Sequence, residues 1–274
     1  MKIQLLVLPL LALMPLRAQA QISALPKAPT APKAASATME TAAAALLSRA
    51  TTTYKEAKGV SLSVITSVND KEVGLSNVRF SRPNMLFVEQ KSGPNTQRLL
   101  LSGNDFYIVQ GAVYKKQPAP TAGGVPINGA QLVESMGGGA GSLLSAMLDG
   151  KNPIKTMLDV YAAPPFVDFQ GRTVALPARI IDGDVLSGVQ TTFSFKVPTR
   201  DGSLSTFGNQ MTAWFGGSPL TLRRIQSRYT QNGKTATLSE KIIDQKLNPT
   251  FAADTFKFND TGLKPVPAVS TSSP

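Results

Sequence analysis

The sequence predicts an α+β protein built on a curved antiparallel β-sheet of roughly ten strands, with a few helices on the apolar face of that sheet. Polar and apolar residues alternate in two long runs, residues 60–117 and 172–245, and turn residues divide each run into short segments. Before the first run and between the two runs, apolar residues instead recur every three or four positions. Two groups of strands, with helices before and between them, follow from these periods.

The first helix begins near Thr38 and Thr41, which can cap it, and Gly59 ends it. Its apolar residues are Ala43, Leu46, Leu47, Ala50 and Tyr54. After Gly59 the period changes to two, and we predict a strand over 60–68, a turn at 69–71 and a partner strand over 74–80. Segments 84–91, 97–102, 105–110 and 112–117 continue the pattern as an antiparallel meander.

Residues 118–163 break the strand pattern and predict a helical insert. One helical stripe contains the candidate lid residues Met136, Leu143, Leu144 and Met147, together with Leu132 and Ala140. Glycines at 137, 138, 139 and 141 loosen this stripe, because each costs about 1 kcal/mol relative to alanine in a helix. The stripe is therefore either stabilised by packing or built to move. Pro153 begins a second short helix that runs to Val160.

The second run of strands covers 172–182, 185–197, 210–215, 220–230 and 235–245. Its clearest alternation sets Phe193, Phe195 and Val197 against Thr192, Ser194 and Lys196. One face of this sheet is therefore polar and the other is apolar.

Residues 1–20 predict a signal peptide, because a short apolar run leads to the small-residue site Ala18-Gln19-Ala20. We expect cleavage after Ala20 and a periplasmic protein that begins at Gln21. Residues 21–37 predict a disordered leader rich in Ala and Pro, and 265–274 predict a disordered tail. The folded domain is expected over 38–264, with the helical insert at 118–163.

Composition excludes several kinds of chemistry. The 274 residues include no Cys and no His, which removes thiolate nucleophiles, imidazole bases and sites that use either side chain as a metal ligand. The chain carries 28 Lys and Arg against 17 Asp and Glu, but these basic residues are dispersed. We therefore expect no enzyme, cofactor, metal or nucleic-acid partner. The positive charge favours transient contact with an anionic membrane or an envelope protein. The alternative is a basic surface that binds no partner.

Two short motifs have simpler explanations than a ligand site. The glycine cluster at 137–141 lacks the Lys-Ser/Thr ending of a phosphate loop and does not follow a strand. Asp182 and Asp184 flank Gly183 between two strands, which is typical of a hairpin turn.

Three stretches resemble the LolA-like periplasmic lipoprotein carriers and the predicted periplasmic proteins grouped with them. The first is the strand, Arg-Pro-Asn turn and strand at 80–87, followed by the hairpin at 99–107. The second is Val185-Leu186-Ser187-Gly188-Val189, which leads into Phe193-Ser194-Phe195. The third is the ending with Leu247-Asn248-Pro249, Asp254-Thr255-Phe256-Lys257-Phe258 and Gly262.

This resemblance implies a strongly bent antiparallel sheet that forms an unclosed half-barrel, with α-helices capping its concave face. In the carriers that cavity holds acyl chains, and the arginine of the Arg-Pro-Asn turn holds the lid shut, a role that falls here on Arg82. The sequence departs from the carriers at Gly103-Asn104-Asp105, where they have Ser-Asp-Gly, and in the insert at 118–163.

We therefore predict a monomeric carrier or receptor for an acyl-bearing hydrophobic ligand, either a lipid or a lipoprotein. An interaction or sensor module with a filled core is the alternative, and a hydrolase comes third because no nucleophile and base are recognisable. The expected ligand-binding residues occupy the apolar phase of their strands: Leu62, Val64, Phe80, Leu99, Leu101, Phe193, Phe195, Met211 and Phe215.

Overall fold

The computed structural model describes residues 36–122, 125–199 and 202–266. The expected signal peptide, the leader as far as residue 35 and the tail from residue 267 lie outside these ranges.

The described residues form one sheet of 13 strands made of two antiparallel meanders. The first meander contains β2 (Gly59–Val68), β3 (Lys71–Ser81), β4 (Met85–Ser92), β5 (Asn95–Ser102), β6 (Asp105–Gln110) and β7 (Val113–Pro118). The second contains β10 (Val167–Ile181), β11 (Asp184–Pro198), β12 (Leu204–Gly216), β13 (Thr221–Gln231) and β14 (Lys234–Leu247). β14 pairs antiparallel with β2 and so joins the two meanders.

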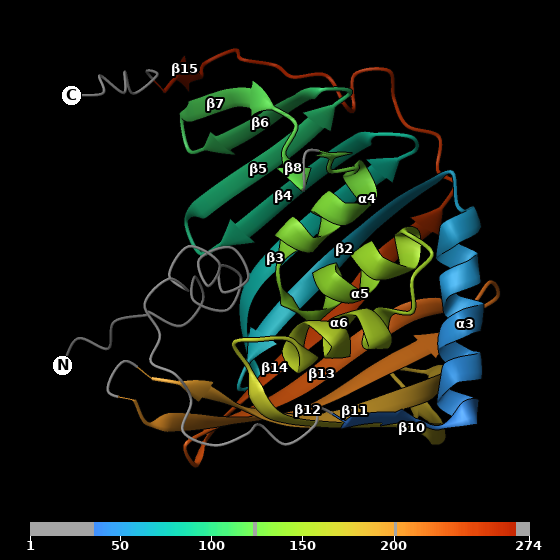
Figure 1. Ribbon diagram of the computed structural model, residues 1–274. Helices are drawn as coiled ribbons and strands as arrows, with labels where there is room; N and C mark the ends of the chain where they lie inside the picture. The colour runs from blue at the N-terminus through green and yellow to red at the C-terminus, as the bar shows by residue number, and fades with distance from the viewer. Residues whose placement is uncertain (1–35, 123–124, 200–201, 267–274) are drawn as a thin grey trace.

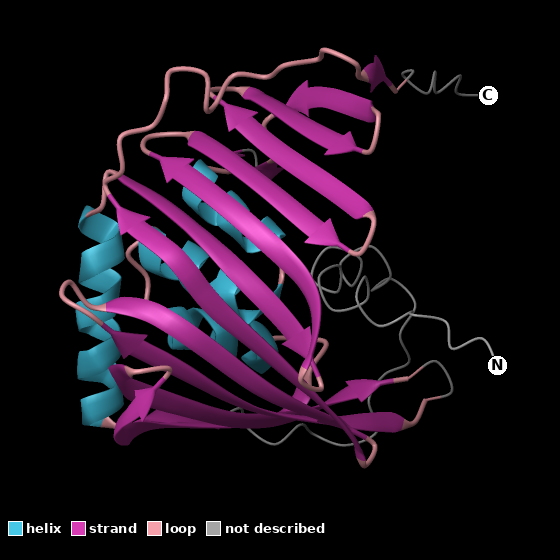
Figure 2. Cartoon of the chain, turned by 180° about the vertical axis from the view of Figure 1, so that it is seen from behind, coloured by secondary structure: helices cyan, strands magenta, loops and turns pink. Residues whose placement is uncertain are grey.

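Short strands add to the two edges of this sheet. β1 (Ser36–Met39) runs parallel to β10, and β15 (Lys264–Pro265) runs parallel to β7. The edge strands β1 and β15 do not pair with each other, so the sheet is bent but not closed (Figure 1). Figure 2 shows the same bend from behind, with the helices on the concave side. The predicted α+β half-barrel is confirmed.

The helices belong to two parts of the chain. α3 (Thr41–Glu56) stands along one side of the half-barrel. Between β7 and β10 the chain forms a small hairpin of β8 (Thr121–Ala122) and β9 (Val125–Pro126), and then the helices α4 (Gly129–Leu132), η2 (Val133–Met136), α5 (Gly138–Leu148) and α6 (Pro153–Ala162). We call α4, η2, α5 and α6 the helical cover. None of the helices in the described ranges is both long and apolar enough to cross a membrane.

The structure corrects three local expectations. The stripe from Leu132 to Met147 is not one helix, because Gly137 (φ 75°, ψ 176°) separates η2 from α5. The first helix is preceded by Glu40 at its N-cap, not by Thr38. Ser36 and Ala37, placed in the leader, belong to β1, because an exposed edge of β10 is available for pairing.

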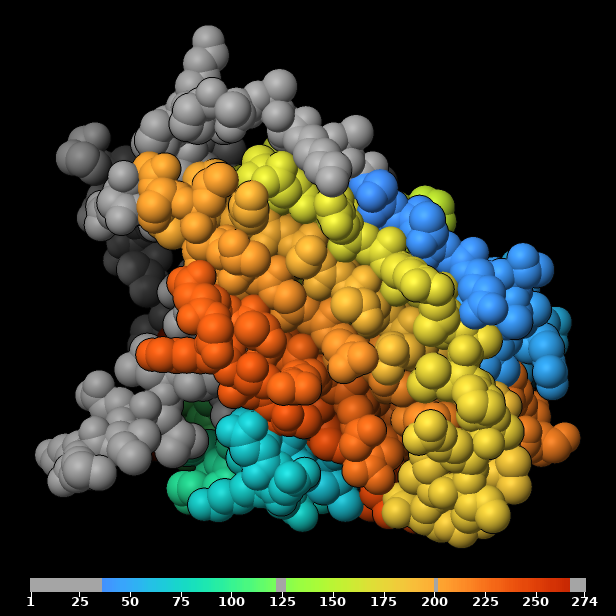
Figure 3. All heavy atoms as spheres, turned by 90° about the horizontal axis from the view of Figure 1, so that it is seen from below, coloured from blue at the N-terminus to red at the C-terminus, as the bar shows by residue number. Residues whose placement is uncertain are grey.

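The core lies between the concave face of the sheet and the helices. Apolar side chains of β2 to β5 and β10 to β14 share one buried cluster with those of α3, α5 and α6. On the opposite side, β10 to β14 form a continuous outer surface, seen from below in Figure 3. The helices therefore complete the core that the sheet leaves open.

Candidate functional site

The structure brings all nine predicted ligand-binding residues together on the concave face. They come from five strands of both meanders, and each side chain is at most 9% exposed. Even-numbered positions on β2 and β3 and odd-numbered positions on β5, β11 and β12 point to the same side, as the alternation predicts. The nine share one apolar cluster: Leu62, Val64, Phe80, Leu99, Leu101, Phe193, Phe195, Met211 and Phe215.

The predicted lid residues lie against this face. Met136 comes from η2, and Leu143, Leu144 and Met147 come from α5, with exposures of 5% or less. All four belong to the same cluster as the sheet residues. A hollow of about 280 Å³ lies elsewhere, around Glu72 to Leu75, Lys91 and Gly93. In this conformation the concave face and its cover are thus in direct contact.

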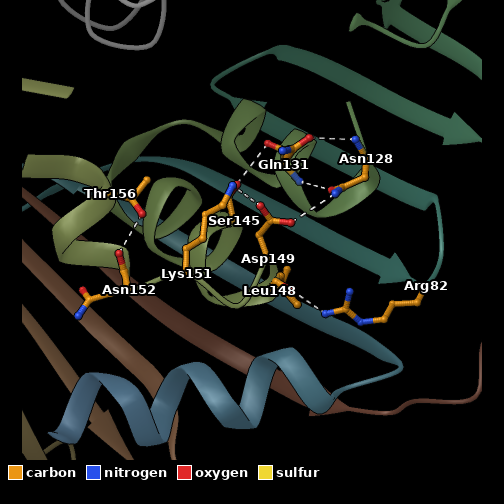
Figure 4. Close-up of polar contacts among 9 residues, drawn as sticks. All are labelled: Arg82, Asn128, Gln131, Ser145, Leu148, Asp149, Lys151, Asn152 and Thr156. Atoms are coloured by element: carbon orange, nitrogen blue, oxygen red, sulfur yellow. Dashed lines mark hydrogen bonds and ion pairs between the residues drawn. The ribbon is translucent and has the colours of Figure 1, made fainter. Parts of the chain in front are cut away.

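Arg82 ties the sheet to both sets of helices. Its Nε donates to the carbonyl of Ala57 at 2.9 Å, and its Nη2 donates to the carbonyl of Lys55 at 3.1 Å, both at the end of α3. The same Nη2 donates to the carbonyl of Leu148, the last residue of α5, at 2.6 Å (Figure 4). The guanidinium also lies 5.5 Å from the centre of the Phe80 ring. One side chain therefore joins the β3–β4 turn, α3 and α5.

Asn84, in the same turn, makes a second connection that the sequence reasoning missed. Its Oδ1 accepts from the backbone N–H of Gly129 at 2.8 Å, and its Nδ2 donates to Gly103. Gly129 begins α4, so the Arg-Pro-Asn turn holds both ends of the segment from α4 to α5. The asparagine of the motif was the signal that could have pointed to this contact.

The loop before α4 is itself linked to the end of α5. Asn128 caps α4 by accepting from the N–H of Gln131, and its Nδ2 donates to Asp149 at 3.4 Å (Figure 4). Lys151 pairs with the same carboxylate. Although burial alone would raise the pKa of Asp149, the bonds from Lys151 and Asn128 bring it below its usual value.

Glu240 on β14 holds the other end of α5. Its Oε2 accepts from the N–H groups of Gly139 at 2.8 Å and Ala140 at 3.0 Å, and the residue is 2% exposed. A carboxylate suits a helix N-terminus, where unpaired N–H groups and the helix dipole favour negative charge. Desolvation nevertheless dominates and raises the pKa of Glu240 to about 7, against the effect of these two bonds.

The glycine cluster is explained by this contact. A Cβ on Gly138 would lie 2.1 Å from Oε1 of Glu240, and Gly138 has φ +68°. The absence of side chains lets the carboxyl reach the helix end. Sequence reasoning missed Glu240, although a glutamate between Leu238 and Ile242 on the apolar phase of a strand was a visible signal.

Two tyrosines, on β13 and α6, also have raised pKa values. Burial, and after it the charge of Glu240, raises the pKa of Tyr229 on β13 to about 12, whereas the nearby hydroxyl of Ser227 acts the other way. Burial and then Glu134 on η2 raise the pKa of Tyr161 on α6. Within the described ranges, no group of three or more Asp or Glu residues could hold a metal ion.

Known proteins match this chain in structure but not in sequence. No family model matches the chain, and no curated protein matches its sequence. Among solved structures it is similar to LprF from Mycobacterium bovis, with 12% identity, a TM-score of 0.38, and coverage of 78% of this chain and 96% of the other.

Two further structures are similar over comparable lengths. A DUF1329 family protein from Desulfovibrio piger has 8% identity and a TM-score of 0.30, covering 81% of this chain and 98% of the other. A putative outer membrane lipoprotein-sorting protein domain from Vibrio parahaemolyticus has 7% identity and a TM-score of 0.27, covering 78% and 97%. At these TM-scores, nothing about the ligand of this chain follows from the three neighbours.

Proposed function

We propose that the protein is a monomeric periplasmic carrier for an acyl-bearing hydrophobic ligand, a lipid or a lipoprotein, and that it binds this ligand without covalent chemistry. The observation that carries the proposal is the position of Arg82, which ties a separate helical cover onto the mainly apolar concave face of a bent sheet. A cover that meets the sheet through side chains and is fastened at identifiable points can lift as a unit. The acyl chain would then take the place of the cover's own apolar side chains.

Lifting the cover would break five contacts. Two involve the β3–β4 turn, namely the bond from Arg82 to Leu148 and the bond from Gly129 to Asn84. The others are the bond from Gln90 on β4 to the carbonyl of Met136, the bonds from the start of α5 to Glu240, and the contact of Asn152 with Sδ of Met39 on β1. An acyl chain contributes about 0.8 kcal/mol per buried CH₂ group, which gives on the order of 10 kcal/mol for a long chain. This gain is large enough to offset a few hydrogen bonds of about 1 to 3 kcal/mol each.

An interaction or sensor module is the second candidate, and one observation favours it. The concave face is already covered by the protein's own apolar side chains. In that case the half-barrel would serve as a rigid support, and the cover would not move.

A disulfide lock separates the two candidates. A Cβ placed on Gly139 would lie 3.2 Å from Cγ2 of Ile225, close to the separation of a Cβ atom and the opposite sulfur in a disulfide. The chain has no cysteine of its own, so a Gly139→Cys, Ile225→Cys double variant carries one defined pair. Binding of a fluorescent fatty acid is measured on the oxidised and the reduced protein.

The carrier proposal predicts weak binding in the oxidised form and restored binding after reduction. The single Gly139→Cys variant, which cannot form the lock, serves as the matched control. Equal binding in both forms, or no binding in either, contradicts the proposal. Mass spectrometry of lipid extracted from the protein purified from its own envelope then identifies the natural ligand.

A further inference from the structure

The concave face carries a polar band within its apolar surface. Asn209 on β12 lies directly opposite Tyr229 on β13, and Glu240 on β14 lies opposite Ile225, further along β13. Asn209 is also opposite Phe193, and cross-strand partners point to the same face, so the polar residues share the face of the apolar cluster. Asn209 is 8% exposed and Glu240 is 2% exposed.

These polar groups are incompletely satisfied by the protein itself. Oδ1 of Asn209 is buried and has no hydrogen-bond partner. The bonds that Glu240 accepts come from Gly139 and Ala140 of α5, which belong to the cover and not to the sheet. If the cover lifts, the carboxyl stays on the concave wall and loses both donors. A buried polar group left without a partner costs about 1 to 3 kcal/mol, so a ligand that supplies donors is favoured there.

The surroundings select against an anionic headgroup. Glu240 is itself an acid, and its charge acts on the phenol of Tyr229, which stays on the sheet when the cover lifts. In the described part of the chain, no Lys or Arg forms an ion pair with Glu240. A headgroup with two hydroxyls supplies one donor for Oδ1 of Asn209 and one for the carboxyl of Glu240, and its oxygens can also accept from the phenol of Tyr229.

We infer that Asn209, Tyr229 and Glu240 form a polar subsite that binds an uncharged, hydroxyl-bearing headgroup once α5 has moved away. This inference rests on the proposed carrier function, because it requires the cover to lift. In the closed protein, the N–H groups of Gly139 and Ala140 occupy the position that the ligand's hydroxyl groups take over. The apolar residues on either side hold the acyl chain, and the polar band fixes which end of the ligand enters.

Three probes with the same 12-carbon chain test the headgroup: 1-dodecanoylglycerol, dodecanoate and dodecylammonium. Each probe displaces a fluorescent alkyl reporter, at concentrations below its micelle point. We expect the glycerol ester to bind about tenfold more tightly than dodecanoate, the difference that one well-made buried hydrogen bond produces. In the Asn209→Leu variant this preference should fall to about twofold or less.

Two further variants make the result specific. Gln210→Leu changes the neighbouring exposed position, on the opposite face of the strand, and should leave the preference intact. Tyr229→Phe removes one hydroxyl without changing the shape of the side chain, and should reduce the preference even if Asn209→Leu disturbs folding.

The outcomes distinguish the subsite from the carrier function. If all three probes bind equally well, or if dodecylammonium or dodecanoate binds best, the acyl site stands and the hydroxyl subsite is refuted. If none of the probes displaces the reporter, the carrier proposal fails and the subsite fails with it. A preference for the glycerol ester that survives in both Asn209→Leu and Tyr229→Phe also refutes the assignment.

Discussion

Replacing Arg82 by leucine should loosen the cover far more than it disturbs the sheet. The guanidinium donates to Ala57, Lys55 and Leu148, and leucine has no donor for any of them. Each such charge-assisted bond contributes about 1.5 to 3 kcal/mol. Of these three bonds, only the one to Leu148 breaks when the cover opens. Removing that bond by substitution should therefore favour the open state by about 10- to 100-fold. The free energy of unfolding should fall by at least about 3 kcal/mol, because the two part-buried carbonyls, of Ala57 and Leu148, each lose a donor, whereas water can replace it at the exposed carbonyl of Lys55.

Hydrogen exchange of the backbone amides measures both effects in one experiment. The N–H groups of Gly139 and Ala140, which start α5 and donate to Glu240, exchange when the cover lifts, whereas amides of β12 and β13 need a larger opening. We therefore expect this start of α5 to lose about 10- to 100-fold in protection, and the release of a bound fluorescent fatty acid to become faster to a similar degree.

Arg79→Leu is the matched control for this variant. Arg79 lies on β3, three residues before Arg82, and its guanidinium is 5.4 Å from the centre of the Phe87 ring, much like Arg82 over Phe80. Its substitution removes a cation–π contact without touching the cover. If Arg82→Leu and Arg79→Leu leave α5 equally protected, the reasoning that makes Arg82 a latch is wrong.

Three other changes should have measurable effects. Glu240→Gln should stabilise the fold at pH 8 by up to about 3 kcal/mol in urea denaturation, because burial raises the carboxyl pKa from 4.5 to about 7. Wild-type stability should fall as the pH rises from 4.5 through 7, so this advantage should vanish near pH 4; an advantage at every pH would contradict it. Gly138→Ala should lower stability by about 1 to 3 kcal/mol more than Gly183→Ala, since both have positive φ but only Gly138 faces a carboxyl. Tyr54→Phe should cost about 2 kcal/mol on thermal or urea unfolding, because the N–H of Leu222 loses its acceptor, and an unchanged midpoint would refute this.

The order of strands and helices could be predicted from the sequence, because it depends on local periods. Alternation with period two identified both meanders, and a period near 3.6 identified α3 and the helical insert. The same alternation placed all nine candidate apolar residues on one face. The role proposed for Arg82 came from the resemblance of the Arg-Pro-Asn turn to the carriers, since nothing in the local pattern says what a turn arginine will contact.

Only the tertiary structure decided how distant parts of the chain meet. The pairing of β14 with β2 joins two separately predicted meanders. It also places Glu240 next to Thr66 of β2. The bond from Arg82 to Leu148 spans 66 residues, and the bond from Gly139 to Glu240 spans 101. From the sequence, Gly138 could be interpreted as loosening a helix. The structure shows instead that a side chain at this position would collide with the carboxyl of Glu240 on β14. A periodic pattern fixes which face a side chain occupies, whereas the partner on that face is fixed by long-range packing, which no local period encodes.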